Sequence, residues 1–188
     1  MNRNTIFALS TAAGKAGLAV IRLSGGRSFE VVKELAGTIP PPRRATLRNL
    51  FYDGELIDQA IVICFNANNS YTGEDVAELH IHGSNAVFSG LIEILGSKLN
   101  LTIANPGEFT RRALENGKMD LLQVEGLLDL IESETKEQKK QALKSLVSKN
   151  SSKTDNWREK ILNALAYTEL MIDFVDQDVP TETCEKIA

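Results

Sequence analysis

The hydrophobic pattern of the chain changes its period once, near Asp120, and this change limits the folds that the sequence can adopt. Before Asp120, short segments alternate apolar and polar residues, as strands do, and glycine-containing turns separate them. After Asp120, apolar residues recur at helical spacing without strand signals. The sequence therefore predicts an α+β fold, with a strand-rich region first and an all-α section behind it.

The first region is predicted to hold several short strands and three helices. Asp53-Gly54 is a typical hairpin turn between two of these strands. Alternation places Arg22 on one face of its strand, and Glu78 on the same face of its own strand as His80 and His82. The predicted strands cover residues 5–9, 18–24, 47–52, 55–65, 76–82 and 101–104, and the predicted helices cover residues 28–35, a segment starting after Ser84, and residues 108–115.

The second region is predicted to be a helical hairpin. One helix runs from Asp120 to about Ser148, and a second is capped by Asp155 and ends before Pro180, with a polar turn at residues 150–154 between them. Such a hairpin buries its apolar stripes fully only against further helices, so we expect a longer protein of which this is the front part. The inward-facing residues of the second helix are predicted to be Trp157, Ile161, Leu165 and Ile172.

Composition excludes several classes of protein. A net charge of −4 argues against a generally basic nucleic-acid surface, although a local patch is compatible with it. Cys64 and Cys184 lie far apart and form neither a disulfide framework nor a CxxC metal motif. No apolar run approaches the roughly 20 residues of a membrane span, and the N-terminus lacks the order of a signal peptide. We therefore expect no membrane partner and a cytoplasmic location.

Two dense polar runs, residues 69–83 and 106–123, point to a functional site. They concentrate carboxylates, basic groups, turn glycines and both histidines beside apolar segments. Glu78, His80 and His82 could supply a zinc or iron site, because H-x-H with a nearby carboxylate is a plausible ligand set. No third histidine exists, so a further carboxylate would have to complete the ligand shell, and hydrogen bonding within a polar cleft or capping of the following helix is the preferred interpretation of the two histidines.

Arg22, Glu78 and Lys118 lie in three separate segments, each beside a turn or a strand end. The flat 2-amino-4-oxo edge of a pterin can bind a carboxylate such as Glu78 through two hydrogen bonds, and the carboxylates of a folate tail can pair with Arg22 or Lys118. Ordinary ion pairing is the alternative interpretation for the two basic residues.

Two basic motifs have simpler explanations. Gly14-Lys15 lacks the full spacing and the following hydroxyl of a phosphate-binding loop, so we expect a turn there and no binding or hydrolysis of GTP by this chain. Lys136, Lys140 and Lys144 form a helical stripe that could meet phosphates. We interpret the stripe as a solvated face, because Glu132 and Glu137 interrupt its charge.

Several long motifs, in order along nearly the whole chain, resemble one known family. They are residues 19–25, 70–76, 78–83, 106–113, 116–121 and 172–178. These runs closely resemble the N-terminal part of the tRNA modification GTPase family MnmE, also called TrmE. Their number and spacing make the resemblance far more specific than any one of them.

The resemblance implies a mixed-sheet tetrahydrofolate-binding and dimerisation domain at residues 1–118, and the first part of a helical domain at residues 119–188. It implies that Arg22, Glu78 and Lys118 contact 5-formyltetrahydrofolate or a related form. The complete enzyme of the family is a homodimer that acts with a flavoprotein partner on tRNA. It forms a 5-carboxymethylaminomethyl-type group on the wobble uridine, and its GTPase domain uses GTP, Mg and K.

This sequence departs from the family pattern at several points. The loop at residues 11–17 lacks the usual proline and Gly-Arg-Gly-Gly, Ser84 follows Gly83 in place of a second glycine, and Val175 replaces a proline. Cys184 does not match the family's C-terminal cysteine motif, and no residue here matches the GTPase domain. Two readings from other classes remain: a metal-dependent enzyme using Glu78, His80 and His82, and a ligand-free dimerisation domain.

Overall fold

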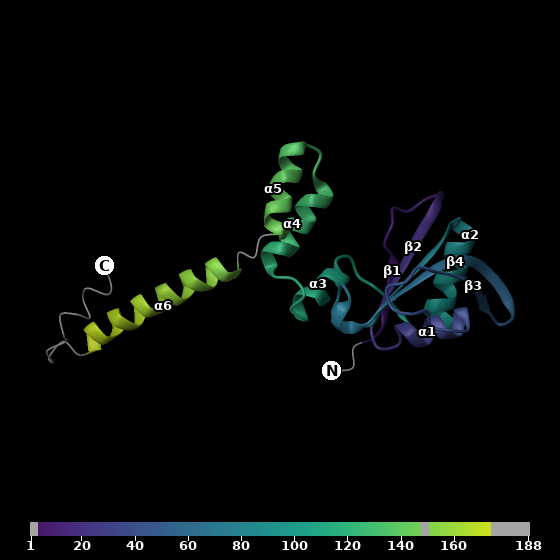
Figure 1. Cartoon of the computed structure of the whole chain (residues 1–188), viewed down its shortest axis with the longest axis horizontal. Helices are drawn as coiled ribbons and strands as arrows, with labels where there is room; N and C mark the ends of the chain where they lie inside the picture. The colour runs from purple at the N-terminus through teal and green to yellow at the C-terminus, as the bar shows by residue number, and fades with distance from the viewer. Residues whose placement is uncertain (1–3, 148–150, 174–188) are drawn as a thin grey trace. The chain divides into compact units, whose positions relative to one another are not determined.

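A computed structural model describes residues 4–147 and 151–173. The chain divides into two compact units, residues 1–119 and 120–188, which differ in secondary structure (Figure 1). The first unit is a sheet with helices, and the second is helical in its described part. This order confirms the α+β fold class. None of the described helices has the length and apolar character that a membrane crossing requires.

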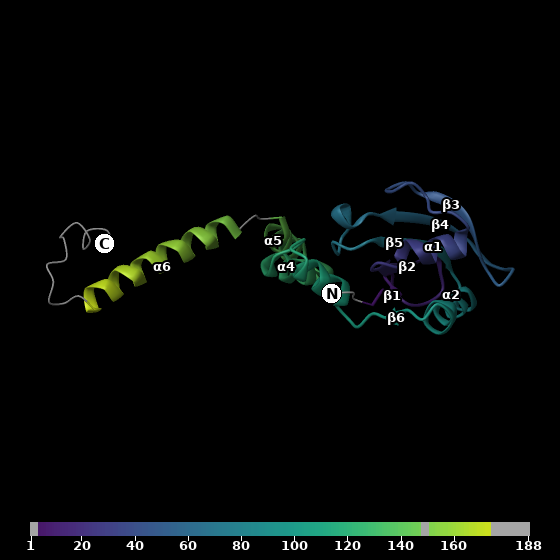
Figure 2. The same cartoon turned by 90° about the horizontal axis from the view of Figure 1, so that it is seen from below.

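A six-stranded mixed sheet forms the frame of the first unit. Figure 2 shows the strand order β3-β4-β5-β2-β1-β6. Neighbouring strands are antiparallel except β1 and β6, which are parallel. The sheet confirms all six predicted strands with small changes at their ends. The strands are β1 Ile6–Leu9, β2 Ala16–Ser24, β3 Thr46–Tyr52, β4 Glu55–Phe65, β5 Val76–Gly83 and β6 Thr102–Ile103.

The hairpin between β3 and β4 turns at the two residues predicted from the sequence. Asp53 and Gly54 both have positive φ, at 50° and 80°. Two successive left-handed residues give the turn type that matches the right-handed twist of the paired strands. The turn therefore sets the pairing of Tyr52 with Glu55, and a register shift between Leu50 and Phe51 leads to the register in which Leu47 lies opposite Ile61.

Two helices cover one face of the sheet. Helix α1 spans Ser28–Ala36, and helix α2 spans Asn85–Glu93 and continues into a π-helical turn at Ile94–Lys98. Both helices contact β5, and their buried side chains belong to a single core with the inward residues of β2, β4 and β5. This core includes Ile21, Leu23, Val31, Val32, Leu35, Val62, Leu79, Ile81, Leu91 and Leu95.

The opposite face of the sheet is more open. Arg22, Glu78 and His80 are half-buried there, while their strand neighbours Ile21, Leu79 and Ile81 are fully buried in the core. The alternation predicted for these strands is therefore confirmed. Helix α3, Glu108–Glu115, ends at Asn116 and Gly117 as predicted, and its side chains approach the residues of this face.

The helical unit differs from the predicted hairpin. One helix to about Ser148 was expected, but two helices form instead, α4 at Leu121–Glu132 and α5 at Lys136–Val147. Thr135 Oγ1 accepts the Gln138 N–H, and the Gln138 side chain accepts the Thr135 N–H, so a capping box starts α5. Gly126 then allows α5 to pack closely, because a Cβ there would lie 2.7 Å from the Leu146 nitrogen.

Helix α6, Ser151–Asp173, also corrects the sequence prediction. Asp155 lies inside this helix and is not its cap, and residues 151–154 are helical and not a turn. Each residue added to an existing helix gains one backbone hydrogen bond, so the polar residues 151–154 can extend the helix in place of forming a turn. The side chains expected to face inward are exposed, by 62% for Trp157 and 67% for Ile161 and Ile172. Pro180 lies outside the described residues.

Candidate ligand-binding site

Arg22 and Glu78 form the centre of the candidate site. They lie directly opposite each other on the neighbouring strands β2 and β5. Arg22 Nε and Nη2 donate to Glu78 Oε1 at 3.0 and 2.9 Å. The side chains are 28% and 17% exposed, so the pair is accessible from solvent but partly shielded. Pairing two charged groups in mid-strand needs a solvent-facing position, which the open face of the sheet provides.

Two aromatic rings flank the Arg22 guanidinium. Its central carbon lies 5.5 Å from the centre of the Tyr71 ring and 5.8 Å from that of Phe109. Tyr71 is on the loop before β5 and Phe109 is on α3, and the Tyr71 hydroxyl hydrogen-bonds Thr110 Oγ1 at 2.8 Å. Sequence reasoning did not select either ring, although both lie in the two polar runs.

Lys118 lies beside the same loop but takes a different partner. Its Nζ donates to the Asn68 carbonyl oxygen at 2.8 Å. Asn116 Nδ2 donates to the Thr72 carbonyl oxygen at 2.6 Å, which fixes the end of α3 against residues 66–75. The structure thus brings Arg22 and Glu78 into contact. Lys118, which follows α3, hydrogen-bonds the loop that carries Tyr71, and among the described residues it forms no hydrogen bond with either of the two.

A buried ion cluster anchors α3 behind the site. Arg112, only 4% exposed, donates to Glu74 Oε2 at 2.9 Å, to Glu108 Oε1 at 3.2 Å and to the Asn4 carbonyl oxygen at 3.0 Å. Ser24 at the end of β2 donates to the same Glu74 oxygen at 2.7 Å. The cluster therefore connects α3, which carries Phe109 and Thr110, to the ends of the strands that carry Arg22 and Glu78.

The electrostatics of the cluster favour the charged form of Glu108. A hydrogen bond from the Asn105 backbone N–H, followed by the Arg112 and Arg111 charges, lowers the pKa of Glu108 against the opposing effect of burial. A carboxyl group with a lowered folded-state pKa adds stability above its unfolded pKa. That stability is lost as the pH falls through the folded value. The cluster therefore stabilises the unit at neutral pH and weakens in acid.

The two histidines of β5 have separate partners. His80 Nε2 lies 3.2 Å from Glu78 Oε2, whereas His82 Nδ1 lies 2.7 Å from Asp58 Oδ1. Across residues 4–147 and 151–173, no group of three or more His, Cys, Asp or Glu side chains is arranged to hold a metal ion. The geometry gives the metal-dependent reading no support.

Cys64 is fully buried on β4, and burial, with Asp75 adding to it, raises its pKa to about 11. It is therefore a protonated, inert core residue at neutral pH.

The chemistry available at the site is recognition: Glu78 can accept two N–H donors, Arg22 and Lys118 can pair with anions, and the rings of Tyr71 and Phe109 can contact a flat group.

Comparison with known proteins extends over both units. Residues 5–118 match the family described as GTP-binding protein TrmE N-terminus, and residues 121–188 match the MnmE helical domain. The chain is 51% identical, over 97% of its length, to the tRNA modification GTPase MnmE of Phenylobacterium zucineum. It is 48% identical, over 98% and 97% of its length, to the proteins of the same name from Dinoroseobacter shibae and Caulobacter vibrioides. It spans 41–43% of the length of these relatives.

Proposed function

This chain belongs to the TrmE N-terminus family and continues into the MnmE helical domain, and we propose that its residues 1–118 bind a reduced folate and form a homodimer. Residues 119–188 are then the first part of a helical domain. The ligand is 5-formyltetrahydrofolate or a related tetrahydrofolate, with Arg22, Glu78 and Lys118 as its contacts. The proposed location is the cytoplasm.

The activity proposed for the complete protein follows from relatives that are named tRNA modification GTPases. With a flavoprotein partner, it forms the 5-carboxymethylaminomethyl-type group on wobble uridine in tRNA. Folate supplies the carbon of this group. GTP hydrolysis, which uses Mg and K, belongs to another part of the protein. Residues 1–188 alone do not turn over GTP in this proposal, because Gly14-Lys15 lacks the spacing and hydroxyl of a phosphate loop.

The Arg22–Glu78 pair with its two flanking rings is the observation that carries the folate proposal. A pterin presents two adjacent N–H donors on a flat ring, which suits a carboxylate beside aromatic side chains. Arg22 already binds one Glu78 oxygen, so a pterin must share or displace that contact. Arg22 and Lys118 remain able to pair with the carboxylates of the folate tail.

Glu78→Ala should weaken the binding of 5-formyltetrahydrofolate ten- to a hundredfold. The substitution removes a charge-assisted contact worth roughly 1.5–3 kcal/mol. Isothermal titration calorimetry of the folded variant measures the change. Glu55→Ala is the matched control, because Glu55 is an exposed carboxylate on β4 of the same sheet. Unchanged affinity in a folded Glu78→Ala variant would remove Glu78 from the site.

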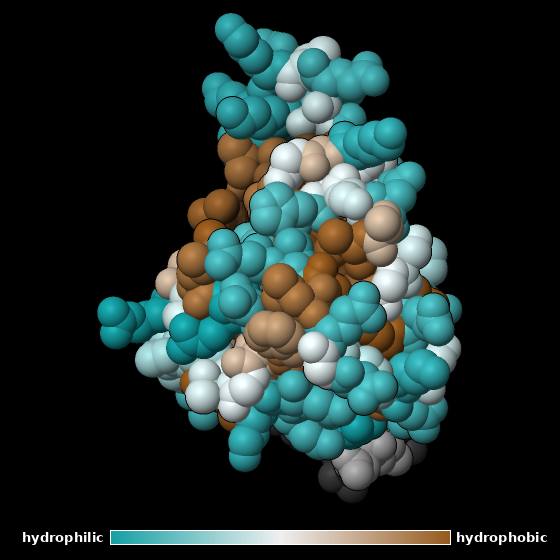
Figure 3. Space-filling view, turned by 90° about the vertical axis from the view of Figure 1, so that its right-hand side faces the viewer, coloured by the Kyte–Doolittle hydropathy of each residue, from teal (hydrophilic) through white to brown (hydrophobic). Residues whose placement is uncertain are grey.

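The open face of the sheet supports the dimer proposal. Leu47, Ile61, His80 and Val20 form a row across four neighbouring strands. Leu47 is 58% exposed and Ile61 is 40% exposed, although both are apolar. Exposed apolar residues are also visible on the side of the molecule in Figure 3. Leu47 and Ile61 thus form an exposed apolar pair that His80 separates from Val20, and exposed apolar residues beside a ligand site are typical of a protein interface.

Light scattering of residues 1–118 should therefore give the mass of a dimer, and Ile61→Lys should shift it to a monomer. A charge placed in an apolar interface loses its hydration without gaining a partner. Ile103→Lys is the control, since Ile103 is also an exposed isoleucine, at 59%, and lies on the edge strand β6. A monomer at high micromolar concentration, with and without folate, contradicts the proposal. A dimer that binds no folate instead supports the ligand-free reading.

A further inference from the structure

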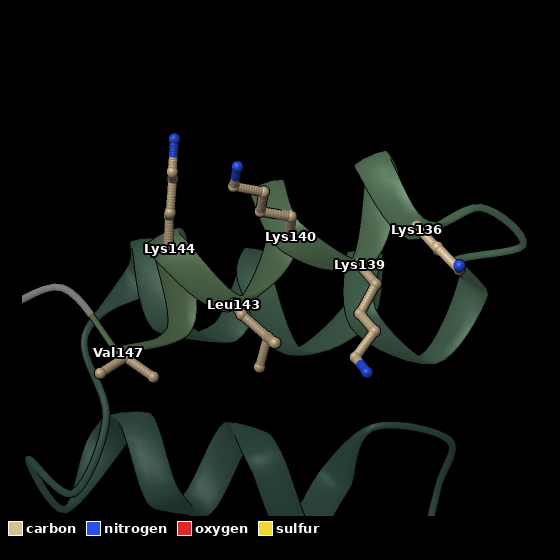
Figure 4. Close-up of a pocket in the computed structure, with 6 residues that line it drawn as sticks. All are labelled: Lys136, Lys139, Lys140, Leu143, Lys144 and Val147. Carbon is tan, nitrogen blue, oxygen red and sulfur yellow. The ribbon is translucent and has the colours of Figure 1, made fainter.

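Four exposed lysines cover one broad face of α5. Lys136, Lys139, Lys140 and Lys144 line a surface cavity of about 710 Å³ together with Leu143 and Val147 (Figure 4). Figure 4 shows Lys140 and Lys144 extending to one side of the helix, and Lys139 extending to the other side with Leu143 and Val147. Successive members of the series 136, 140 and 144 lie about 6 Å apart along the helix axis. We call these four residues the α5 lysines.

The structure places most acidic residues of the hairpin on a different helix from the α5 lysines. Helix α4 contains three carboxylates and no basic residue. Glu132 belongs to α4 and not to the lysine helix, and Glu137 lies with it and Asp129 along a different cavity of about 450 Å³. The break at residues 133–135 therefore removes Glu132 from the lysine helix, and the expectation that Glu132 interrupts the positive stripe is wrong, whereas Glu137 stays on α5 as the one carboxylate of that helix.

The α5 lysines are also uncompensated. No ion pair joins any of them to a carboxylate within the part of the chain that the structure describes. Positions at this helical spacing usually form the apolar stripe of a packed helix. A concentration of like charges there is unfavourable for an isolated helix, since lysines four residues apart repel each other. An anionic partner would relieve this repulsion.

We propose that the α5 lysines bind the phosphate backbone of RNA, specifically of tRNA. The inference rests on the proposed function, which makes tRNA the substrate. A chain with a net charge of −4 repels a polyanion as a whole, so attraction must come from a local patch. Regularly spaced lysines act as flexible point charges that neutralise successive phosphates without reading sequence. The face therefore contributes affinity and salt dependence, and not base specificity.

The test compares two variants of residues 1–188 that lose the same charge. The first replaces Lys136, Lys139, Lys140 and Lys144 with glutamine, which keeps a strong helix former at each position. The control replaces Lys15, Lys33, Arg44 and Lys98, all exposed residues of the first unit, with glutamine. The probe is a tRNA transcript with an unmodified wobble uridine, and fluorescence anisotropy gives its affinity as a function of KCl concentration.

The α5 variant should bind the transcript at least about tenfold more weakly, and its salt slope should fall by roughly three, because each phosphate contact contributes about 0.7–0.9. The control and a four-arginine version of the α5 variant should stay near the parent chain. Equal losses in both glutamine variants, no loss in either, or no binding of tRNA by the parent chain would overturn the proposal. The proposal would also be overturned if the α5 variant bound tRNA as well as the parent chain does and lost only the binding of an acidic protein partner.

A folate titration of the same samples separates the two proposals. The α5 variant should retain the folate affinity of the parent chain, because none of its substitutions lies in the first unit. If the parent chain binds tRNA through α5 but binds no folate, the folate proposal fails and the α5 contact stands. If the parent chain binds folate and the α5 variant binds tRNA as tightly as the parent chain does, the α5 proposal fails and the folate proposal stands.

Discussion

Arg112→Ala should lower the free energy of unfolding of the sheet-containing unit by about 3–5 kcal/mol. The substitution removes the only basic side chain that bonds both Glu74 and Glu108 among the described residues, and so leaves two shielded carboxylates without their cation. It also releases the hydrogen bond to the Asn4 carbonyl oxygen. Urea unfolding followed by circular dichroism measures the loss.

Arg111→Ala is the matched control for this experiment. Arg111 is the preceding residue of the same helix, but its side chain is 62% exposed and its ion pairs are longer, at 3.5 and 4.0 Å. Exposed pairs of this kind contribute about 0–1 kcal/mol. The difference in unfolding free energy between the two variants should narrow in acid. The pKa of Glu108 is lowered, so its ion pair with Arg112 stabilises the unit at neutral pH and is lost as the carboxylate is protonated. Equal losses at pH 7 would show that the cluster does not anchor α3.

Gly126→Leu should open the α4/α5 hairpin at a cost of about 3 kcal/mol or more. A Cβ at this position would lie 2.7 Å from the Leu146 nitrogen and 2.8 Å from the Ser145 Cβ. The first neighbour is helix backbone and cannot rotate away, so α5 itself must move. The expected result is faster hydrogen exchange along α4 and α5, with unchanged exchange in the strands.

Gly90→Leu provides the comparison within the same chain. Gly90 also lies inside a helix, α2, but nothing lies within 4 Å of a Cβ built there. Leucine is a better helix former than glycine by somewhat under 1 kcal/mol, so this variant should be neutral or slightly stabilised. If Gly126→Leu behaved in the same way, close packing at Gly126 would not hold the hairpin together.

Local patterns predicted the sheet well because each strand has its own signal. Alternation identified the faces of β2 and β5, and Asp53-Gly54 marked the hairpin. Asn116-Gly117 gave the end of α3. The break between α4 and α5 was missed because it contains neither glycine nor proline, and its signal is the single pair Thr135 and Gln138.

The site shows the limit of local reasoning. Arg22 and Glu78 were selected separately, but their contact depends on the pairing of β2 with β5, which alternation does not define. Tyr71 and Phe109 are separated from Arg22 by dozens of residues, and only the tertiary fold brings their rings to its guanidinium. The roles proposed for Arg22, Glu78 and Lys118 in folate binding remain predictions.

The position of Arg22 and Glu78 in the middle of two paired strands ties ligand recognition to folding accuracy. A shift of one residue between β2 and β5 would turn one charged side chain toward the core and place an apolar residue opposite the other. A chain paired in the wrong register would thus lose its carboxylate–guanidinium pair at the same moment as its core. Misfolded copies would therefore not bind the ligand, and they would not compete with native copies for it.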